Sequence, residues 1–91
     1  MSAKHIERPA LSAGDIVMAK AGRGKGRVFL VIAAAENGYV YISDGKTRKV
    51  SNAKLKKNLH LLRLGRVENT EFLTAPGAAA DAEIRKIVKE V

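Results

Sequence analysis

The chain of 91 residues lacks cysteine and tryptophan, and its only histidines are His5 and His60. The absence of cysteine excludes disulfides and thiolate metal sites. It also fits a reducing compartment such as the cytoplasm, where we expect the protein to be located. Two histidines with no nearby ligand spacing do not make a metal site. The sequence therefore predicts a protein that holds no metal.

Long apolar runs are also missing. No stretch approaches the ~18 residues that a membrane-spanning helix needs, and the first residues contain no apolar signal-peptide core. We therefore expect no membrane partner. Residues 1–12, which include Pro9 and show no periodicity, are expected to form a flexible lead-in.

Recognisable catalytic motifs are absent from the sequence. The run Gly22-Arg23-Gly24-Lys25-Gly26 superficially resembles a phosphate-binding loop. It lacks the Lys-Ser/Thr ending and the following helix that such a loop needs. No nucleophile elbow or paired carboxylates replace it. The sequence predicts a non-enzymatic protein with no cofactor and no small-molecule substrate.

What the sequence does contain is positive charge, and that charge is concentrated in its middle. Residues 20–63 hold eleven Lys and Arg against two acids, Glu36 and Asp44, for a net charge of +9. The other residues hold six Lys and Arg against seven acids, for a net charge of −1. Solubility alone would not require this segregation, whereas a polyanionic partner would favour it. An anionic membrane is a weaker candidate because no basic amphipathic helix carries the charge.

The same middle region reads as β-structure. Short apolar and β-branched segments predict strands at 16–20, 27–34, 39–43, 48–50 and 59–64. Asn37-Gly38 and Asp44-Gly45 predict tight turns between them. Residues 51–58 are expected to form a basic loop. Five short strands with tight turns predict a small antiparallel barrel over residues 13–65.

A different pattern follows the predicted barrel. Residues 66–77 read as a linker, and residues 78–91 predict a short C-terminal helix. Its apolar stripe has the i, i+3, i+4, i+7 spacing and consists of Ile84, Ile87, Val88 and Val91. Acids lie near its start and lysines near its end, as the helix dipole favours. We expect this helix to dock weakly on the barrel.

Three basic clusters lie in the segment of net charge +9. If one end of the barrel gathers its loops, the clusters form a single surface whose cations neutralise phosphates. The candidate RNA-binding residues are Lys20, Arg23, Lys25, Arg27, Lys46, Arg48, Lys49, Lys54, Lys56, Lys57, Asn58 and His60. The scarcity of aromatic residues disfavours base stacking on a single strand and favours folded RNA, recognised through backbone and shape. The alternative is a flexible turn and an ordinary solvated loop.

The segment GDIVMAKAGRGKGRVFLVI, residues 14–32, resembles a KOW motif. Together with ISDGKTRKV and NAKLKKNLHLLRL, it is similar to the small bacterial KOW-domain RNA-binding proteins, which are related to large-subunit ribosomal proteins of archaeal and eukaryotic type. The resemblance covers residues 14–64 and leaves the C-terminal helix outside.

This resemblance implies an SH3-like barrel that binds RNA, in particular ribosomal RNA, within a ribonucleoprotein of translation. It implies ribosomal proteins as further partners, and neither enzymatic activity nor a cofactor. KOW barrels of elongation factors also bind proteins. A protein-interaction module of the translation or transcription machinery is therefore the alternative function.

Overall fold

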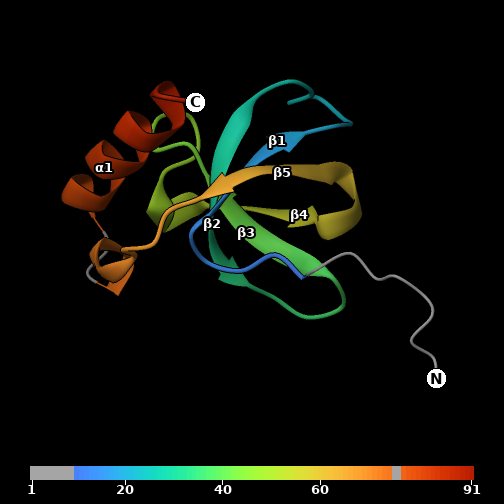
Figure 1. The fold of residues 1–91 in the computed structure, drawn as a ribbon, viewed down its shortest axis with the longest axis horizontal. Helices are drawn as coiled ribbons and strands as arrows, with labels where there is room; N and C mark the ends of the chain where they lie inside the picture. Colours follow the sequence, from blue (N-terminus) through green and yellow to red (C-terminus); the bar gives the residue numbers. More distant parts are fainter. Residues whose placement is uncertain (1–9, 75–76) are drawn as a thin grey trace.

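The computed structural model describes residues 10–74 and 77–91. Most of the described chain forms one antiparallel sheet in the order β4-β3-β2-β1-β5 (Figure 1). Its strands are β1 (Asp15–Ala19), β2 (Val28–Ala34), β3 (Tyr39–Ser43), β4 (Lys54–Lys57) and β5 (Leu61–Arg66). The other elements are the helix α1 (Ala78–Lys89) and the 3₁₀ turns η2 (Val50–Asn52), η3 (Asn58–His60) and η4 (Glu71–Thr74). The prediction of a mostly β chain with a C-terminal helix is confirmed.

The sheet curls around one apolar core. Inward-facing residues alternate along the strands, as Val17 and Ala19 do on β1 and Val40 and Ile42 do on β3. The core cluster consists of Leu11, Val17, Ala19, Phe29, Val31, Val40, Ile42 and Leu61. Because Leu11 belongs to this core, the predicted flexible lead-in of residues 1–12 is wrong at its C-terminal end. Residues 1–9 of that prediction lie outside the described residues.

The sheet is not closed into a barrel by hydrogen bonds. Strand β4 pairs with β3 and β5 pairs with β1, and within the described residues no ladder joins β4 to β5. The chain passes from β4 to β5 through η3, whose backbone finds other partners. Asn58 N donates to Gly38 O at 2.7 Å, and Lys20 N donates to His60 O at 2.8 Å. The backbone of this link is therefore bonded to residues at the ends of β1 and β3, in place of a fifth ladder between β4 and β5.

The hairpin between β2 and β3 has the predicted Asn-Gly turn. Asn37 and Gly38 have φ angles of 59° and 79°. Two successive positive φ angles are what a type I′ turn requires, and Asn-Gly provides them at low steric cost. The predicted strand at 39–43 is confirmed without change, because its hairpin turn and its alternating burial both mark its limits.

The predictions for residues 48–58 are partly wrong. No strand forms at 48–50, because the Arg48 carbonyl accepts bonds from Ser43 Oγ at 2.6 Å and from Asp44 N at 3.0 Å and so closes a turn. The fourth strand lies instead at Lys54–Lys57, inside the predicted basic loop. Lysines at an edge strand are common because they oppose pairing with another chain. Strand β5 begins at Leu61, two residues later than predicted.

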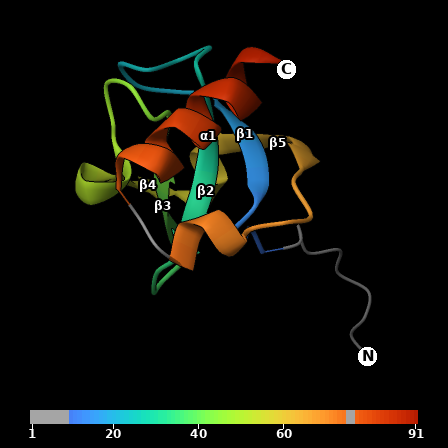
Figure 2. The ribbon, with the colours of Figure 1, turned by 90° about the vertical axis from the view of Figure 1, so that its left-hand side faces the viewer.

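Helix α1 packs on the face of β2 opposite the core, in front of the sheet in Figure 2. Leu30 on this face and Ile84 of α1 are both fully buried. Polar contacts add to this docking: Asp81 Oδ1 accepts from Val50 N at 2.8 Å, and Arg85 Nη1 donates to Gly45 O at 2.7 Å. The helix thus docks on the sheet, as predicted, through a buried apolar face and two tertiary hydrogen bonds.

The predicted linker at 66–77 is also partly structured. Arg66 ends β5, and η4 occupies Glu71–Thr74 in contact with α1. Residues 75–76 lie outside the described residues. Within the described part of the chain, no helix is long and apolar enough to cross a membrane.

Candidate nucleic-acid interface

The turn between β1 and β2, residues 20–27, is held by its own backbone. Gly26 N donates to Ala19 O at 2.8 Å, and Arg27 N donates to Gly24 O at 2.9 Å. Gly26 has a φ of 88°, in the region that favours glycine. Arg23 and Lys25 are exposed on this ordered turn. Both predicted site residues are therefore available to a partner.

Arg27 connects this turn to the loop after β3. Its Nη2 lies 2.8 Å from Asp44 Oδ2 and 2.9 Å from Thr47 Oγ1. Its guanidinium carbon also lies 5.7 Å from the centroid of the Phe29 ring. The side chain nevertheless remains 51% exposed. Arg27 can therefore hold the loop and still face a partner.

Asp44 organises the loop that carries Lys46. Its carboxylate accepts from Arg48 N, Thr47 Oγ1, Lys46 N and Arg27 Nη2 at 2.7 to 2.9 Å. Burial acts to raise the pKa of Asp44. The hydrogen bonds from Arg48, Thr47 and Lys46 and the charge of Arg27 outweigh it and lower the pKa below its ordinary value. The carboxylate is therefore ionised at neutral pH, and its oxygens are occupied by protein donors.

Lys56 joins the predicted basic residues of the segment 54–60 to those of the β1–β2 turn. Its side chain lies on the same face of the sheet as that of the buried Val40, its cross-strand partner on β3. Its Nζ donates to the carbonyl oxygen of Ala21 in the β1–β2 turn at 3.1 Å. Lys56 thus supports the turn, and the prediction that it is simply a loop cation beside Arg23 is corrected.

Lys57 lies on the other face of β4. Its Nζ lies 5.9 Å from the centroid of the Tyr39 ring, on the outer side of the sheet with Tyr41 and Leu55. Successive residues of a strand point to opposite faces, so Lys56 and Lys57 cannot share one surface. The prediction that residues 54–57 form one basic loop patch is therefore wrong for Lys57. Lys54 is half-buried on the same face as Lys56.

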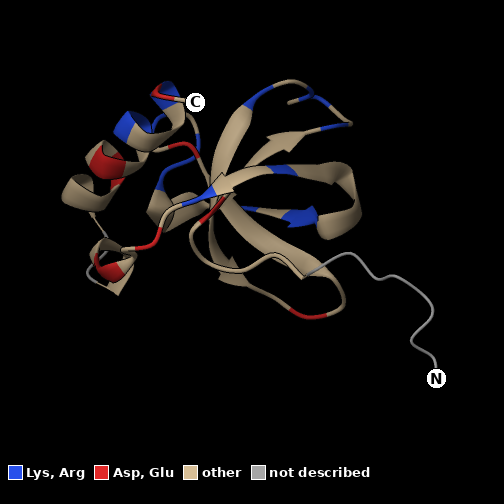
Figure 3. Ribbon diagram, in the orientation of Figure 1, with Lys and Arg blue, Asp and Glu red and all other residues tan. Residues whose placement is uncertain are grey.

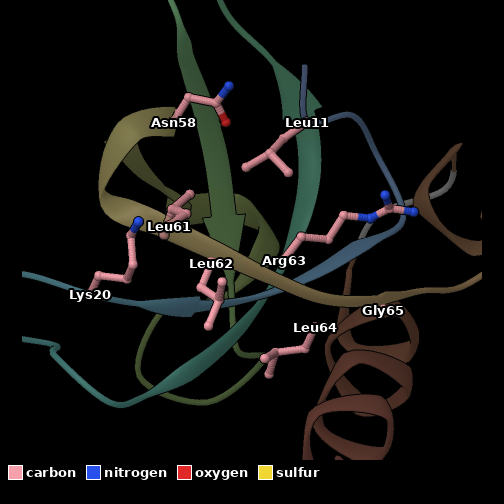
Figure 4. A pocket seen from close by; sticks show the side chains of 8 residues that line it. All are labelled: Leu11, Lys20, Asn58, Leu61, Leu62, Arg63, Leu64 and Gly65. Atoms are coloured by element: carbon pink, nitrogen blue, oxygen red, sulfur yellow. The ribbon is translucent and has the colours of Figure 1, made fainter. Parts of the chain in front are cut away.

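Lys20, Asn58 and His60 meet where η3 crosses the end of the sheet. The backbones of Lys20 and His60 are hydrogen-bonded, and Lys20 and Asn58 line a cavity of about 430 Å³ beside β5 (Figure 4). Figure 4 shows Asn58 and Leu11 on one side of the β5 ribbon, with Leu62 and Leu64 on the other. Asn58 Oδ1 is buried and has no hydrogen-bond partner among the described residues.

The remaining predicted residues, Arg48 and Lys49, lie on the loop before η2. Arg48 Nη1 reaches Asn52 O at 3.4 Å, and Lys49 is exposed. Within the described chain, neither side chain forms a hydrogen bond or an ion pair with the β1–β2 turn. They continue the basic surface from Lys46 only along the loop.

Two cations that the sequence prediction did not include lie beside this loop. Arg85 and Lys89 of α1 line a groove of about 490 Å³ together with Arg27 and Lys46. The signal that could have found them is their i, i+4 spacing, which places both on one face of a helix. In contrast, Arg63 and Arg66 of β5 both bind the buried carboxylate of Asp15, at 3.2 and 2.8 Å.

Figure 3 shows the resulting distribution of charge. Lys and Arg gather on the β1–β2 turn, on the loop after β3, along β4 and near the end of α1. Glu36 lies in the β2–β3 turn, away from these segments along the strands. These cations come from four parts of the chain. The contacts of Arg27 with Asp44 and of Lys56 with the Ala21 carbonyl join the β1–β2 turn to the loop after β3 and to β4.

No protein-family model matches the chain, and no curated protein matches it significantly.

Proposed function

We propose that the protein is a non-enzymatic RNA-binding protein that contacts structured RNA through its basic turn and loop. In this proposal the open sheet is an SH3-like barrel of KOW type. Support for the fold comes from the strand order β4-β3-β2-β1-β5 and from the short η3 link that brings β4 directly into β5.

The observation that carries this proposal is the pair of contacts that joins the basic segments. Arg27 binds Asp44 at 2.8 Å, and Lys56 binds the Ala21 carbonyl at 3.1 Å. These contacts hold the β1–β2 turn against both the loop after β3 and strand β4. Cations held in place lose less conformational freedom on binding than cations on loose chains.

Structured RNA fits this surface better than single-stranded RNA. Phe29 is buried in the core, and Tyr39 and Tyr41 lie on the outer face with Lys57. No aromatic platform among the described residues accompanies Arg23 and Lys25, so phosphate contacts must provide most of the affinity. The resemblance of residues 14–64 to KOW-domain proteins directs the proposal to ribosomal RNA in the cytoplasm.

The test is a salt titration of binding to purified ribosomal RNA. If roughly six phosphates are contacted, the slope of log K against log salt should be about −4 for single-stranded contacts and steeper for a duplex. Lys25→Gln should reduce the magnitude of this slope by about 0.7 to 0.9. Lys57→Gln is the matched control on the outer face. A slope near zero for the wild-type protein would contradict the proposal.

The outer face favours a second candidate function, protein interaction. Tyr41 and Leu55 form a cross-strand pair there and are 39% and 47% exposed. Strand β4 pairs only with β3 within the described chain. This function would be favoured if the protein failed to bind ribosomal RNA and bound a ribosomal or transcription protein with little salt dependence, in a manner lost in Tyr41→Ser.

A further inference from the structure

We propose that α1 is part of the RNA-binding surface and that the groove between α1 and the Asp44–Arg48 loop seats one backbone phosphate of the RNA. The inference rests on the proposed function and extends it to an element outside the KOW resemblance. The groove has a volume of about 490 Å³. Its lining residues are Arg27, Val28, Asp44, Lys46, Arg85, Val88 and Lys89.

The charge of the groove favours an anion. Four cationic side chains line it, and they come from the β1–β2 turn, the loop after β3 and α1. The single carboxylate, Asp44, already accepts four hydrogen bonds from protein donors. Its oxygens are therefore directed at the loop and at Arg27, and the net charge of the groove remains positive. Convergent cations of this kind bind phosphate oxygens through charge-assisted hydrogen bonds.

The helix that contributes two of these cations is fixed in place. Ile84 is fully buried, Asp81 accepts from Val50 N, and Arg85 donates to Gly45 O at 2.7 Å. Lys89 follows Arg85 by four residues and therefore lies on the same face of α1, next to the groove. Arg85 contributes to the anchoring of α1, so Lys89, which is exposed, is the cation of α1 best placed to bind a ligand.

The test compares Lys89→Gln with Lys86→Gln in binding to purified ribosomal RNA. The two lysines lie in the same last turn, are both exposed, and lose the same charge, but Lys86 does not line the groove. We expect Lys89→Gln to weaken binding about three- to tenfold and to reduce the magnitude of the salt slope by about 0.7 to 0.9. Lys86→Gln should change affinity less than about twofold, and Lys89→Arg should restore binding.

The possible outcomes separate this inference from the proposed function. Equal losses in Lys89→Gln and Lys86→Gln, or no loss in either, would overturn the role of α1 while RNA binding itself stood. If wild-type protein did not bind ribosomal RNA, both proposals would fail. Circular dichroism melts of each variant check that the fold is unchanged, which is expected because both side chains are exposed.

Discussion

At the scale of single residues, Asp44 decides the shape of the basic loop. Its carboxylate binds two backbone amides within its own turn and also holds Arg27 from the preceding strand pair. One acidic residue in a segment of net positive charge thus positions several of its cations. Counting charges along the sequence treats Asp44 as a small reduction of the net charge, whereas its effect is to order the loop.

The lowered pKa of Asp44 predicts how the stability of an Asp44→Asn variant depends on pH. The ionised carboxyl stabilises the folded state above the unfolded-state pKa, near 3.9, and this contribution is lost as the pH falls through the lower pKa of the folded protein. At pH 7 the variant should be less stable by about 1 to 3 kcal/mol, because an amide cannot replace an ionised acceptor of four donors. Urea unfolding at neutral pH measures this loss.

The same comparison in acid, below the lowered pKa of the folded-state carboxyl, provides the check, since the wild-type carboxyl is then protonated as well. The difference between the two proteins should then shrink. A difference that stayed constant from neutral to acidic pH would show that the charge of Asp44 contributes nothing.

Gly45 and Gly26 allow a matched prediction about the two turns. Both have positive φ, 73° and 88°, but their surroundings differ. A Cβ at Gly45 would meet the Asp81 carbonyl oxygen and lie 3.0 Å from Arg85 Cγ, whereas one at Gly26 would have no neighbour within 4 Å. Gly26→Ala should cost about 1 to 2 kcal/mol for the left-handed conformation alone. Gly45→Ala should cost more, because α1 must move.

Thermal melts of the two alanine variants measure the difference. Equal losses would mean that α1 is not seated against the Asp44-Gly45 turn. Gly26 therefore requires only its dihedral angle, whereas the close approach occurs at Gly45.

At the scale of elements, β4 is the strand that the sequence pattern did not predict. The segment Lys54-Leu55-Lys56-Lys57 has one apolar residue, and that residue faces outward. A half-buried strand is normally found by apolar residues at every second position, and here lysines occupy the inward positions. The long aliphatic stem of lysine can cover apolar surface while its ammonium reaches a polar partner, as Lys56 does with Ala21 O.

We therefore predict different roles for Lys54 and Lys56, which lie on the same face of β4. Lys56→Met should loosen the β1–β2 turn, because the Ala21 carbonyl loses its donor. Amide hydrogen exchange at Lys25 and Gly26 should then become faster, while the melting temperature changes little. Lys54→Met is the control, since Lys54 lies on the same face beside Ile42 and not beside the turn. Similar exchange rates in both variants would contradict the supporting role of Lys56.

In contrast to β4, helix α1 was predictable from the sequence in its extent, although not in its position. Its extent was predictable to within two residues, because apolar spacing, acids near its start and lysines near its end agree. Its position against the sheet was not predictable, since the docking contacts join Asp81 to Val50 and Arg85 to Gly45 across 31 and 40 residues. Local periodicity carries no information about such distant partners.

At the scale of the whole molecule, the sequence predicted the strands with apolar alternation and missed what depends on polar contacts. Strands β1, β2 and β3 lie within one residue of their predicted limits, because Asn37-Gly38 and the apolar runs mark them. The site was predicted in part. The β1–β2 turn and Lys46 lie together as expected, but Lys57 lies on another face and Lys89 was missed. The face of the sheet on which a cation lies depends on strand register, and the sequence pattern predicted a loop where β4 forms.

Pairings between distant parts of the chain also fix the order in which contacts can form while the chain is being synthesised. Strand β1 has only one possible neighbour until β5 has been synthesised, since Asp15 pairs with Arg66 across 51 residues. The Val50 amide can bond its acceptor, the Asp81 carboxylate, only after a further fifteen residues beyond Arg66 have been synthesised. A nascent chain can therefore complete its sheet before α1 docks against Val50 and Gly45. Contacts this distant in sequence also slow folding, and the docking of α1 is the last of them to become possible.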